Sequence, residues 1–502
     1  MAKKKKEKKK KLLSPITTML LLIFIVLIGS SWLAILNIDS TQTTIENGIL
    51  ETSIVVVQNI FSKEGLTYFF SNIITNFNLL QPFILLILSV MAVSIAKNSG
   101  LLKHLFSPLK KLKPQILTFI VIFISVISTI IGDYSYIILL PLVAVLYQYV
   151  NKSPVLGIIT VFIGITLGYG TGIFYNYNDY ALGLLTEAAA VVDVDSSYRF
   201  NLYSNLYIMI ASTIAISFIL TALVEKYLSK KITSVEKYND EIVISKKALI
   251  GGLIILVLCF VGCFFFIRPG GILLDETQTH YVAKLFSPSS PFNLAFMFIF
   301  LFIISLTSLV YGILSKNFKN NHDFSWGFTK EFNNIGYLFV LLFLASILIG
   351  IIDWTNLGVV IANQLIYLIS LFDFTGILLI IITFVFIILM SILIPGSIEK
   401  WVLISPVLVP LFMRGNLTPD FAQFVFKAAD SVGKIITPLF IYFIVMVGFI
   451  QKYNTNENKV TLFNTMKLIW PIILTMIIFW LLILIIWYVA GLPLGINTLA
   501  TM

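Results

Sequence analysis

Apolar residues along this chain are gathered into long runs separated by polar loops. A run of about 20 apolar residues is long enough to cross a bilayer as an α-helix. The sequence predicts such spans at 16–36, 79–96, 116–131, 155–173, 202–224, 248–267, 292–314, 335–352, 374–394, 435–450 and 468–489. We therefore expect residues 16–502 to form one transmembrane domain, in an all-α polytopic membrane protein.

Two segments interrupt the pattern of spans in the same way. The chain reads GDYSYIILLPLVAVLYQYVNKSP from Gly132 and GSIEKWVLISPVLVPLFMRGNLTP from Gly396. In each, a proline inside the apolar run is followed 13 residues later by a second proline, at Pro154 and Pro419. A mid-run proline frees backbone groups that protein or water must satisfy inside a membrane. We therefore predict two re-entrant helical hairpins.

The predicted hairpins, at about 132–153 and 396–418, enter the membrane from opposite sides. The first follows a basic loop that should be cytosolic, and the second follows a stretch that should lie outside. Inverted repeats with interrupted helices are typical of secondary transporters, whose site lies at the repeat interface near the bilayer midplane. Prolines that merely kink ordinary buried helices are the alternative. With the hairpins set apart, about nine transmembrane helices are expected.

Composition and charge agree with a membrane protein and not with a nucleic-acid-binding one. Of 502 residues, 58% are hydrophobic and 12% charged, about half the roughly 25% charged residues of a soluble domain. Eight lysines within the tail 1–15, against Glu7, supply most of the net charge of +10. A basic tail before the first span stays cytosolic. Because no Lys or Arg follows Gly491, the C-terminus should be extracytoplasmic, in a multi-pass protein of the cell membrane.

Charged residues follow the second hairpin where the chain is otherwise apolar. An ionisable group in a span costs about 2.5 to 3.5 kcal/mol on insertion scales, which makes it a candidate for function. Lys427, Asp430 and Lys434 lie three and four residues apart, on one face of a helix. The two lysines could bind an anionic substrate group beside the carboxylate. A structural ion pair, with Lys434 reaching towards the surface, is the alternative.

A tyrosine-rich break, YGTGIFYNYNDY, follows the first hairpin and contains Asn176, Asn178 and Asp179. Its glycines loosen the helix and would expose carbonyl groups. Asp179 offers a carboxylate suited to coupling with a proton, or with sodium as a possible ligand. The alternative is an extracytoplasmic loop with a helix-capping aspartate.

The start of the second hairpin carries Ser397, Glu399, Lys400 and Trp401. Trp401 could stack on an aromatic ligand, although Trp is also common at membrane interfaces. Glu399 and Lys400, like Asp133 at the first hairpin, could instead simply meet water.

Motifs for other energy sources and for metal binding are absent from the sequence. There is no GxxxxGK[ST] and no HExxH, and none of the three histidines neighbours another. We therefore expect no cofactor, no metal centre and transport driven by a proton or sodium gradient.

Three separated stretches resemble the p-aminobenzoyl-glutamate transporter (AbgT) family. They begin TEAAAVVDVDSSYRF at Thr186, KWVLISPVLVPLFM at Lys400 and ADSVGKIITPL at Ala429. The resemblance runs over most of the chain. It implies a dimeric inner-membrane protein with nine spans and two re-entrant hairpins. It also implies import of p-aminobenzoyl-glutamate, or export of sulfonamide-type antimetabolites, on an ion gradient.

The resemblance also assigns site residues by position. The functional Asp, Trp, Pro and Asp of the family correspond to Asp179, Trp401, Pro419 and Asp430. The chain departs from the family pattern at the following positions: Lys427 in place of the usual Arg, Gly396 and Ile398 in place of serines, Ser391 in place of Asn, and added charges at Glu399 and Lys434. A lysine lacks the two-pronged geometry with which arginine binds a carboxylate.

The favoured hypothesis is an ion-gradient-driven secondary transporter of a small anionic or amphipathic solute, similar to p-aminobenzoyl-glutamate. We expect this transport to be carried out by a homodimer in the lipid bilayer. An efflux pump for sulfonamide-type antimetabolites is one alternative. The others are a membrane-embedded enzyme, with Asp179 and Asp430 as acid and base, and a channel or scaffold. No nucleophile or metal ligands accompany those carboxylates, so an enzyme is not expected.

Overall fold

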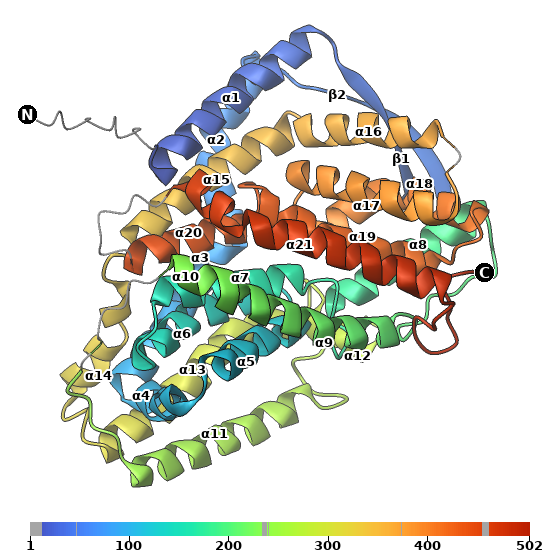
Figure 1. Ribbon diagram of the computed structural model, residues 1–502. Helices are drawn as coiled ribbons and strands as arrows, with labels where there is room; N and C mark the ends of the chain where they lie inside the picture. Colours follow the sequence, from blue (N-terminus) through green and yellow to red (C-terminus); the bar gives the residue numbers. More distant parts are fainter. Residues whose placement is uncertain (1–12, 47, 233–237, 239, 373, 454–460) are drawn as a thin grey trace, which may run out of the picture.

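The computed structural model describes residues 13–46, 48–232, 238, 240–372, 374–453 and 461–502 (Figure 1). The predicted basic tail therefore lies, except for residues 13–15, outside the described residues. The longer elements are α1 (Pro15–Ile35), β1 (Asp39–Glu46), β2 (Ile49–Val56), α2 (Lys63–Leu79), α3 (Gln81–Asn98), α5 (Pro114–Ile127), α6 (Tyr134–Tyr149), α7 (Pro154–Leu167), α8 (Tyr177–Asp193), α9 (Leu206–Leu223), α11 (Lys246–Ile267), α13 (Pro291–Leu314), α15 (Gly336–Trp354), α16 (Leu357–Ser370), α17 (Gly376–Leu393), α18 (Ser397–Arg414), α19 (Pro419–Gly433), α20 (Ile441–Tyr453) and α21 (Leu462–Val489). The short helical segments are α4 (Leu101–Phe106), α10 (Ser229–Lys231), α12 (Tyr281–Phe286), α14 (Asn321–Gly327), η1 (Ser107–Lys111), η2 (Ser128–Ile131), η3 (Val224–Leu228), η4 (Lys330–Phe332) and η5 (Lys434–Ile436).

Nine helical stretches in the described part of the chain are long and apolar enough to cross a membrane. They are α1, α2 with α3, α5 with η2, α9 with η3 and α10, α11, α13, α15, α17 and α21. The prediction of an all-α polytopic membrane protein with about nine spans is confirmed. The predicted span at 79–96 begins earlier, at Lys63, because α2 and α3 are separated only by Leu80.

Two predicted spans are not straight spanning helices. The predicted span at 155–173 was too long, because α7 ends at Leu167 and the glycine-rich break follows. The predicted span at 435–450 is the second half of a bent pair, in which α19 with η5 meets α20 at 42°. The Thr437 hydroxyl, at the break, donates to the carbonyl of Ile392 on α17 at 2.9 Å. The break is therefore attached to a neighbouring helix.

The two proline-containing segments form helix pairs larger than the predicted hairpins. Window 132–153 holds one helix, α6, and a turn, so its second arm is α7. Window 396–418 likewise holds α18 and a turn, and α19 follows. The internal prolines do not end α6 or α18. A proline removes a backbone hydrogen bond only near its own position. The helix can therefore continue past it where neighbouring helices pack around it. Whether the pairs are re-entrant stays a prediction.

The turns of the two helix pairs are built alike. Asn151 and Asn416 adopt left-handed conformations with φ of 57° and 59°. Each asparagine is followed three residues later by the proline that begins the next helix, at Pro154 and Pro419. Asparagine tolerates this conformation, and proline is favoured in the first turn of a helix. The two turns thus share their backbone conformation and their proline position, and the inverted orientation of the two units stays a prediction.

Helices of both pairs meet in the centre of the molecule. α6 packs on α7, α19 packs on α17 and on α7, and α18 packs on α8. In Figure 1, α19 lies in the middle of the stack formed with α17, α18 and α21, whereas α11 lies at the edge. α11 packs chiefly on α13, and only 6% of its apolar window is buried. All fifteen residues of α19 are buried, which makes it the core helix of the site.

Two features near the surface were not predicted from the sequence. The segment after the first span contains the antiparallel strands β1 and β2, with Asp39 opposite Val56. Elsewhere, Glu331 lies between Lys97 at 2.6 Å and Lys452 at 2.8 Å, with all three side chains nearly buried. Burial alone would raise the pKa of the Glu331 carboxyl, but the two lysines outweigh it and hold that pKa below its ordinary value.

Candidate substrate-binding site

The first part of the site is the break between α7 and α8. Asn176 caps α8: its side chain accepts from the backbone N–H of Asp179 at 2.9 Å, and the Asp179 carboxylate accepts from the N–H of Asn176 at 3.1 Å. This reciprocal pair is a capping box. Gly170 brings the break close to α19, since a Cβ there would lie 3.2 Å from the backbone of Lys427 and Ala428. The break is therefore held tightly against the core helix.

Asp179 also forms a buried ion pair across two helices. Its second oxygen binds the ammonium of Lys427 on α19, and the two side chains are 7% and 2% exposed. The Lys427 Nζ is also 3.7 Å from the sulfur of Met209. Asp179 thus both caps α8, as in the structural alternative, and neutralises a buried lysine, and its role in ion coupling stays a prediction.

Asp430 is the centre of a second set of buried charges, and its side chain is fully buried. One carboxylate oxygen binds Lys400 and accepts from the Ser391 hydroxyl at 2.9 Å. The other accepts from the Ser397 hydroxyl at 2.5 Å and lies 3.1 Å from the Nζ of Lys434. Two ammonium groups and two hydroxyl donors around one carboxylate favour its charged form.

The predicted stripe of three charges is therefore divided between two sites. Lys427 binds Asp179, whereas Lys434 binds Asp430, although all three residues of the stripe lie on α19 and η5. The second lysine that binds Asp430 is Lys400, which reaches it from α18.

Trp401 is linked to the Asp179 side of the site through neutral polar groups. It is fully buried, and its ring centroid lies 4.5 Å from that of Phe426. Its indole N–H donates to the Thr186 hydroxyl at 3.0 Å, and that hydroxyl is 3.1 Å from the side-chain oxygen of Gln423. The Gln423 amide donates to the backbone carbonyl of Asp179 at 3.3 Å. Trp401 packs in the protein interior, where neither water nor lipid surrounds it.

The other predicted residues lie on the edge of this arrangement. Asn178 and Glu399 line a cavity beside Lys434. Pro419 lies away from it, in the first turn of α19, which the Thr418 hydroxyl caps. Within the described residues, no group of three or more His, Cys, Asp or Glu side chains could hold a metal ion. A sodium role for Asp179 stays a prediction.

Two adjoining cavities open beside the Asp430 site. The first, of about 270 Å³, is lined by Leu80, Asp133, Tyr169, Asn178, Ile349, Pro395, Gly396, Ser397, Ile398, Glu399, Lys434, Leu439, Phe440, Ile441 and Tyr442. The second, of about 470 Å³, shares Ile349, Pro395, Gly396, Glu399 and Leu439 with it and extends to Asp353. We call the two together the joined cavity. The first turns of both helix pairs, at Asp133 and Ser397, thus face one space.

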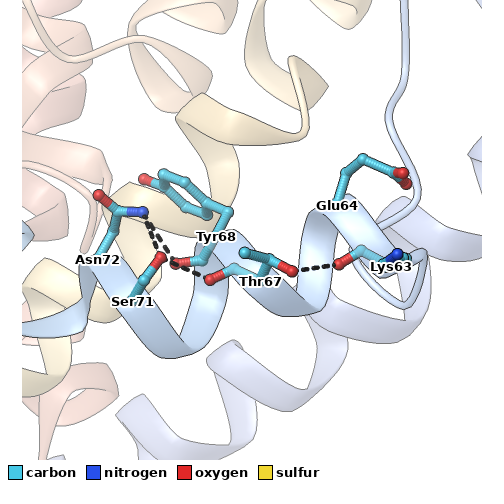
Figure 2. A pocket seen from close by; sticks show the side chains of 6 residues that line it. All are labelled: Lys63, Glu64, Thr67, Tyr68, Ser71 and Asn72. Atoms are coloured by element: carbon cyan, nitrogen blue, oxygen red, sulfur yellow. Dashed lines mark hydrogen bonds between the residues drawn. The ribbon is translucent and has the colours of Figure 1, made fainter.

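Another hollow lies on the surface of α2 and is lined by its own polar side chains (Figure 2). Thr67 and Ser71 donate to backbone carbonyls one turn earlier, at 2.8 and 2.6 Å. Asn72 does the same at 3.1 Å. Most of these polar groups are satisfied within their own helix, so this hollow offers few free contacts to a ligand.

Sequence reasoning missed several residues that complete the site. Lys400 was expected to meet water, yet it is fully buried and is the closest partner of Asp430. The detectable signal was a lysine followed directly by the apolar run WVLIS. Ser391, Thr186 and Gln423 are neutral, and nothing in their spacing indicated that they bridge the charged groups.

Comparisons with known proteins place the chain in a family. Residues 6–502 match the model of the AbgT putative transporter family. The chain is 26% identical over 453 residues to the p-aminobenzoyl-glutamate transport protein of Escherichia coli K12. The aligned region covers 88% of this chain and 86% of that protein.

Two solved structures are also similar. The Alcanivorax borkumensis YdaH transporter is 23% identical, covers 96% of this chain and 100% of its own, and has a TM-score of 0.48. Neisseria gonorrhoeae MtrF, described as illuminating a class of antimetabolite efflux pumps, is 23% identical, covers 97% and 98%, and has a TM-score of 0.49. Because the family match extends over nearly the whole chain, this protein belongs to the AbgT family, is a membrane transporter and is not an enzyme.

Proposed function

We propose that the protein is an ion-gradient-driven secondary transporter of a small amphipathic or anionic organic solute, with its site between the two helix pairs. The observation that carries the proposal is Asp430, a fully buried carboxylate shared by two lysines at the junction of α18 and α19. Buried charges of this kind are expensive, and inside membrane proteins they mark ion and substrate pathways.

The two buried ion pairs give the proposal a physical mechanism. Protonating Asp430 would leave Lys400 and Lys434 without a counter-charge, and an entering ligand could then compete for them. Protonating Asp179 would likewise release Lys427. Hydrogen bonds through Gln423 and Thr186 link the backbone carbonyl of Asp179 to Trp401, the residue that follows Lys400 in the chain. A proton is therefore our first candidate for the coupling ion, and sodium the second.

The substrate follows from the relatives by analogy. The E. coli relative is named for p-aminobenzoyl-glutamate, and MtrF is described with antimetabolite efflux pumps. We propose p-aminobenzoyl-glutamate or a sulfonamide-type compound as the solute, carried by a homodimer in the cell membrane with its N-terminus in the cytosol.

Transport by purified protein in proteoliposomes tests this function. Labelled p-aminobenzoyl-glutamate and a labelled sulfonamide would be assayed in both directions under imposed proton and sodium gradients. We expect D430N to abolish gradient-driven transport while the protein still inserts and folds. D39N, at an exposed position on β1, is the matched control and should transport normally. Undiminished transport per folded D430N molecule would contradict the proposal.

A second variant separates coupling from binding. We expect D179N to lose gradient-driven accumulation while retaining part of the substrate exchange between the two faces, because exchange needs the moving unit but no net ion release. Parallel measurement of exchange and accumulation checks this. Unchanged accumulation would move the coupling site from Asp179 to Asp430.

A further inference from the structure

The joined cavity has an excess of acidic side chains. Asp133, Asp353 and Glu399 line it and are exposed, and Lys434 is the only basic side chain on its walls among the residues that the structure describes. None of the three carboxylates takes part in the ion pairs found among the described residues, whereas Lys434 pairs with Asp430. Carboxylates therefore outnumber ammonium groups on the walls of the joined cavity.

The lysines nearby are not free to receive an anion. An ammonium group has three donors, and Lys434 directs its Nζ to Asp430, to the Ser397 hydroxyl and to the ring of Tyr169, 3.7 Å from the centroid. Lys400, fully buried, binds Asp430 and donates to Ser391 at 2.7 Å. A carboxylate of a substrate would have to displace a protein carboxylate to reach either ammonium.

The wall of the joined cavity also offers aromatic surface and an unused hydroxyl. Tyr169, Phe440 and Tyr442 line it together with aliphatic side chains. Tyr169 is 9% exposed, and its hydroxyl has no well-aligned hydrogen-bond partner, with Ser397 the nearest interacting side chain. A buried hydroxyl without a partner carries an energetic cost that a hydrogen-bonding ligand would remove.

We propose that the joined cavity binds the amine or ammonium end of an aromatic solute. Carboxylates accept hydrogen bonds from N–H groups, and an ammonium is attracted to aromatic faces within about 6 Å. The inference rests on the proposed function and names the chemical class recognised by that site. It reverses the polarity expected from the sequence, in which Lys427 and Lys434 would have held an anion. A solute whose aromatic ring carries an amine should therefore place that end in the joined cavity.

Binding of three small probes to the purified full-length protein in detergent tests the inference. Benzylammonium, benzoate and benzyl alcohol share one ring and differ in the charge of the attached group. We expect isothermal titration at neutral pH to give at least about tenfold tighter binding of benzylammonium than of benzoate, a difference of about 1.4 kcal/mol. Equal or tighter binding of benzoate would overturn the inference.

Variants locate the effect in the joined cavity. E399Q and D353N should each weaken benzylammonium binding by about tenfold and leave benzyl alcohol unchanged. Both positions are exposed, so the variants should fold. E64Q, an exposed glutamate on α2 in the hollow of Figure 2, is the matched control and should bind like the parent. If E399Q and D353N both keep the affinity of the parent, the carboxylates do not recognise the amine.

The two sets of experiments distinguish failure of this inference from failure of the transport proposal. Loss of transport in D430N without a preference for benzylammonium would retain the transporter and overturn the inference. A benzylammonium preference that depends on Glu399, in a protein whose transport is unaffected by D430N, would retain the cavity and overturn the proposed mechanism.

Discussion

Replacing Asp430 should lower the free energy of unfolding by more than replacing Lys400. D430N leaves two nearly buried ammonium groups, those of Lys400 and Lys434, without their counter-charge. Breaking a buried ion pair by deleting one partner costs about 3 to 5 kcal/mol, and we expect D430N at the upper end. K400M should cost about 3 kcal/mol, because Asp430 keeps Lys434 and the hydroxyls of Ser391 and Ser397.

A double variant separates pairing from packing. In K400M with D430N, the most deeply buried ammonium and its carboxylate are removed together. The double variant should therefore be more stable than D430N alone, with a coupling energy of about 2 kcal/mol or more. The free energy of unfolding would be measured by titrating the purified protein from mild detergent into denaturing detergent. If K400M costs as much as D430N, or if the two losses simply add, the reasoning about the shared carboxylate is wrong.

Three further predictions concern other parts of the molecule. E331Q should cost about 3 kcal/mol by stranding its two lysines; because its folded pKa lies below the ordinary 4.5, this stabilisation is complete above that pH and is lost as pH falls. Unfolding measured against pH should then show a flatter acid limb in E331Q than in the parent, and equal limbs would refute the pairing. G170A should reduce transport more than it reduces folded yield, since its methyl group would meet the α19 backbone at 3.2 Å; a fully active variant would show that the contact can relax. A cysteine at Thr498 should react with an impermeant reagent added outside intact cells and one at Ala2 should not, and equal labelling would disprove the predicted orientation.

The spans were predictable because a membrane leaves only one solution for a long apolar run, a helix with its own backbone bonds. The same argument could not separate a spanning helix from half of a helix pair. Residues 155–173 form a long apolar run, yet α7 ends at Leu167, where a glycine-rich break contacts α19. That length is set by tertiary contacts, which hydropathy does not contain.

The sequence predicted which charged residues of α19 and η5 form the site, but not which ion pairs they make. Helical spacing placed Lys427, Asp430 and Lys434 on one helix correctly, but spacing along one helix cannot report which neighbour faces each turn. The facing groups, Asp179 from α8 and Lys400 from α18, come from 248 and 30 residues away. Only the packing of α19 between these helices decides which carboxylate each lysine binds.

The bend between α19 and α20 lies between two of the charged contacts described above. Lys434 lies just before the bend, and Lys452 lies near the far end of α20, bound to Glu331. With 13 residues, α20 is about 20 Å long, so a tilt of about 5° at the break moves its far end by about 1.7 Å. Such a movement exceeds the tolerance of a 2.8 Å ion pair. Any change of the bend angle would therefore be felt at the Lys452–Glu331 contact at the opposite end of the helix.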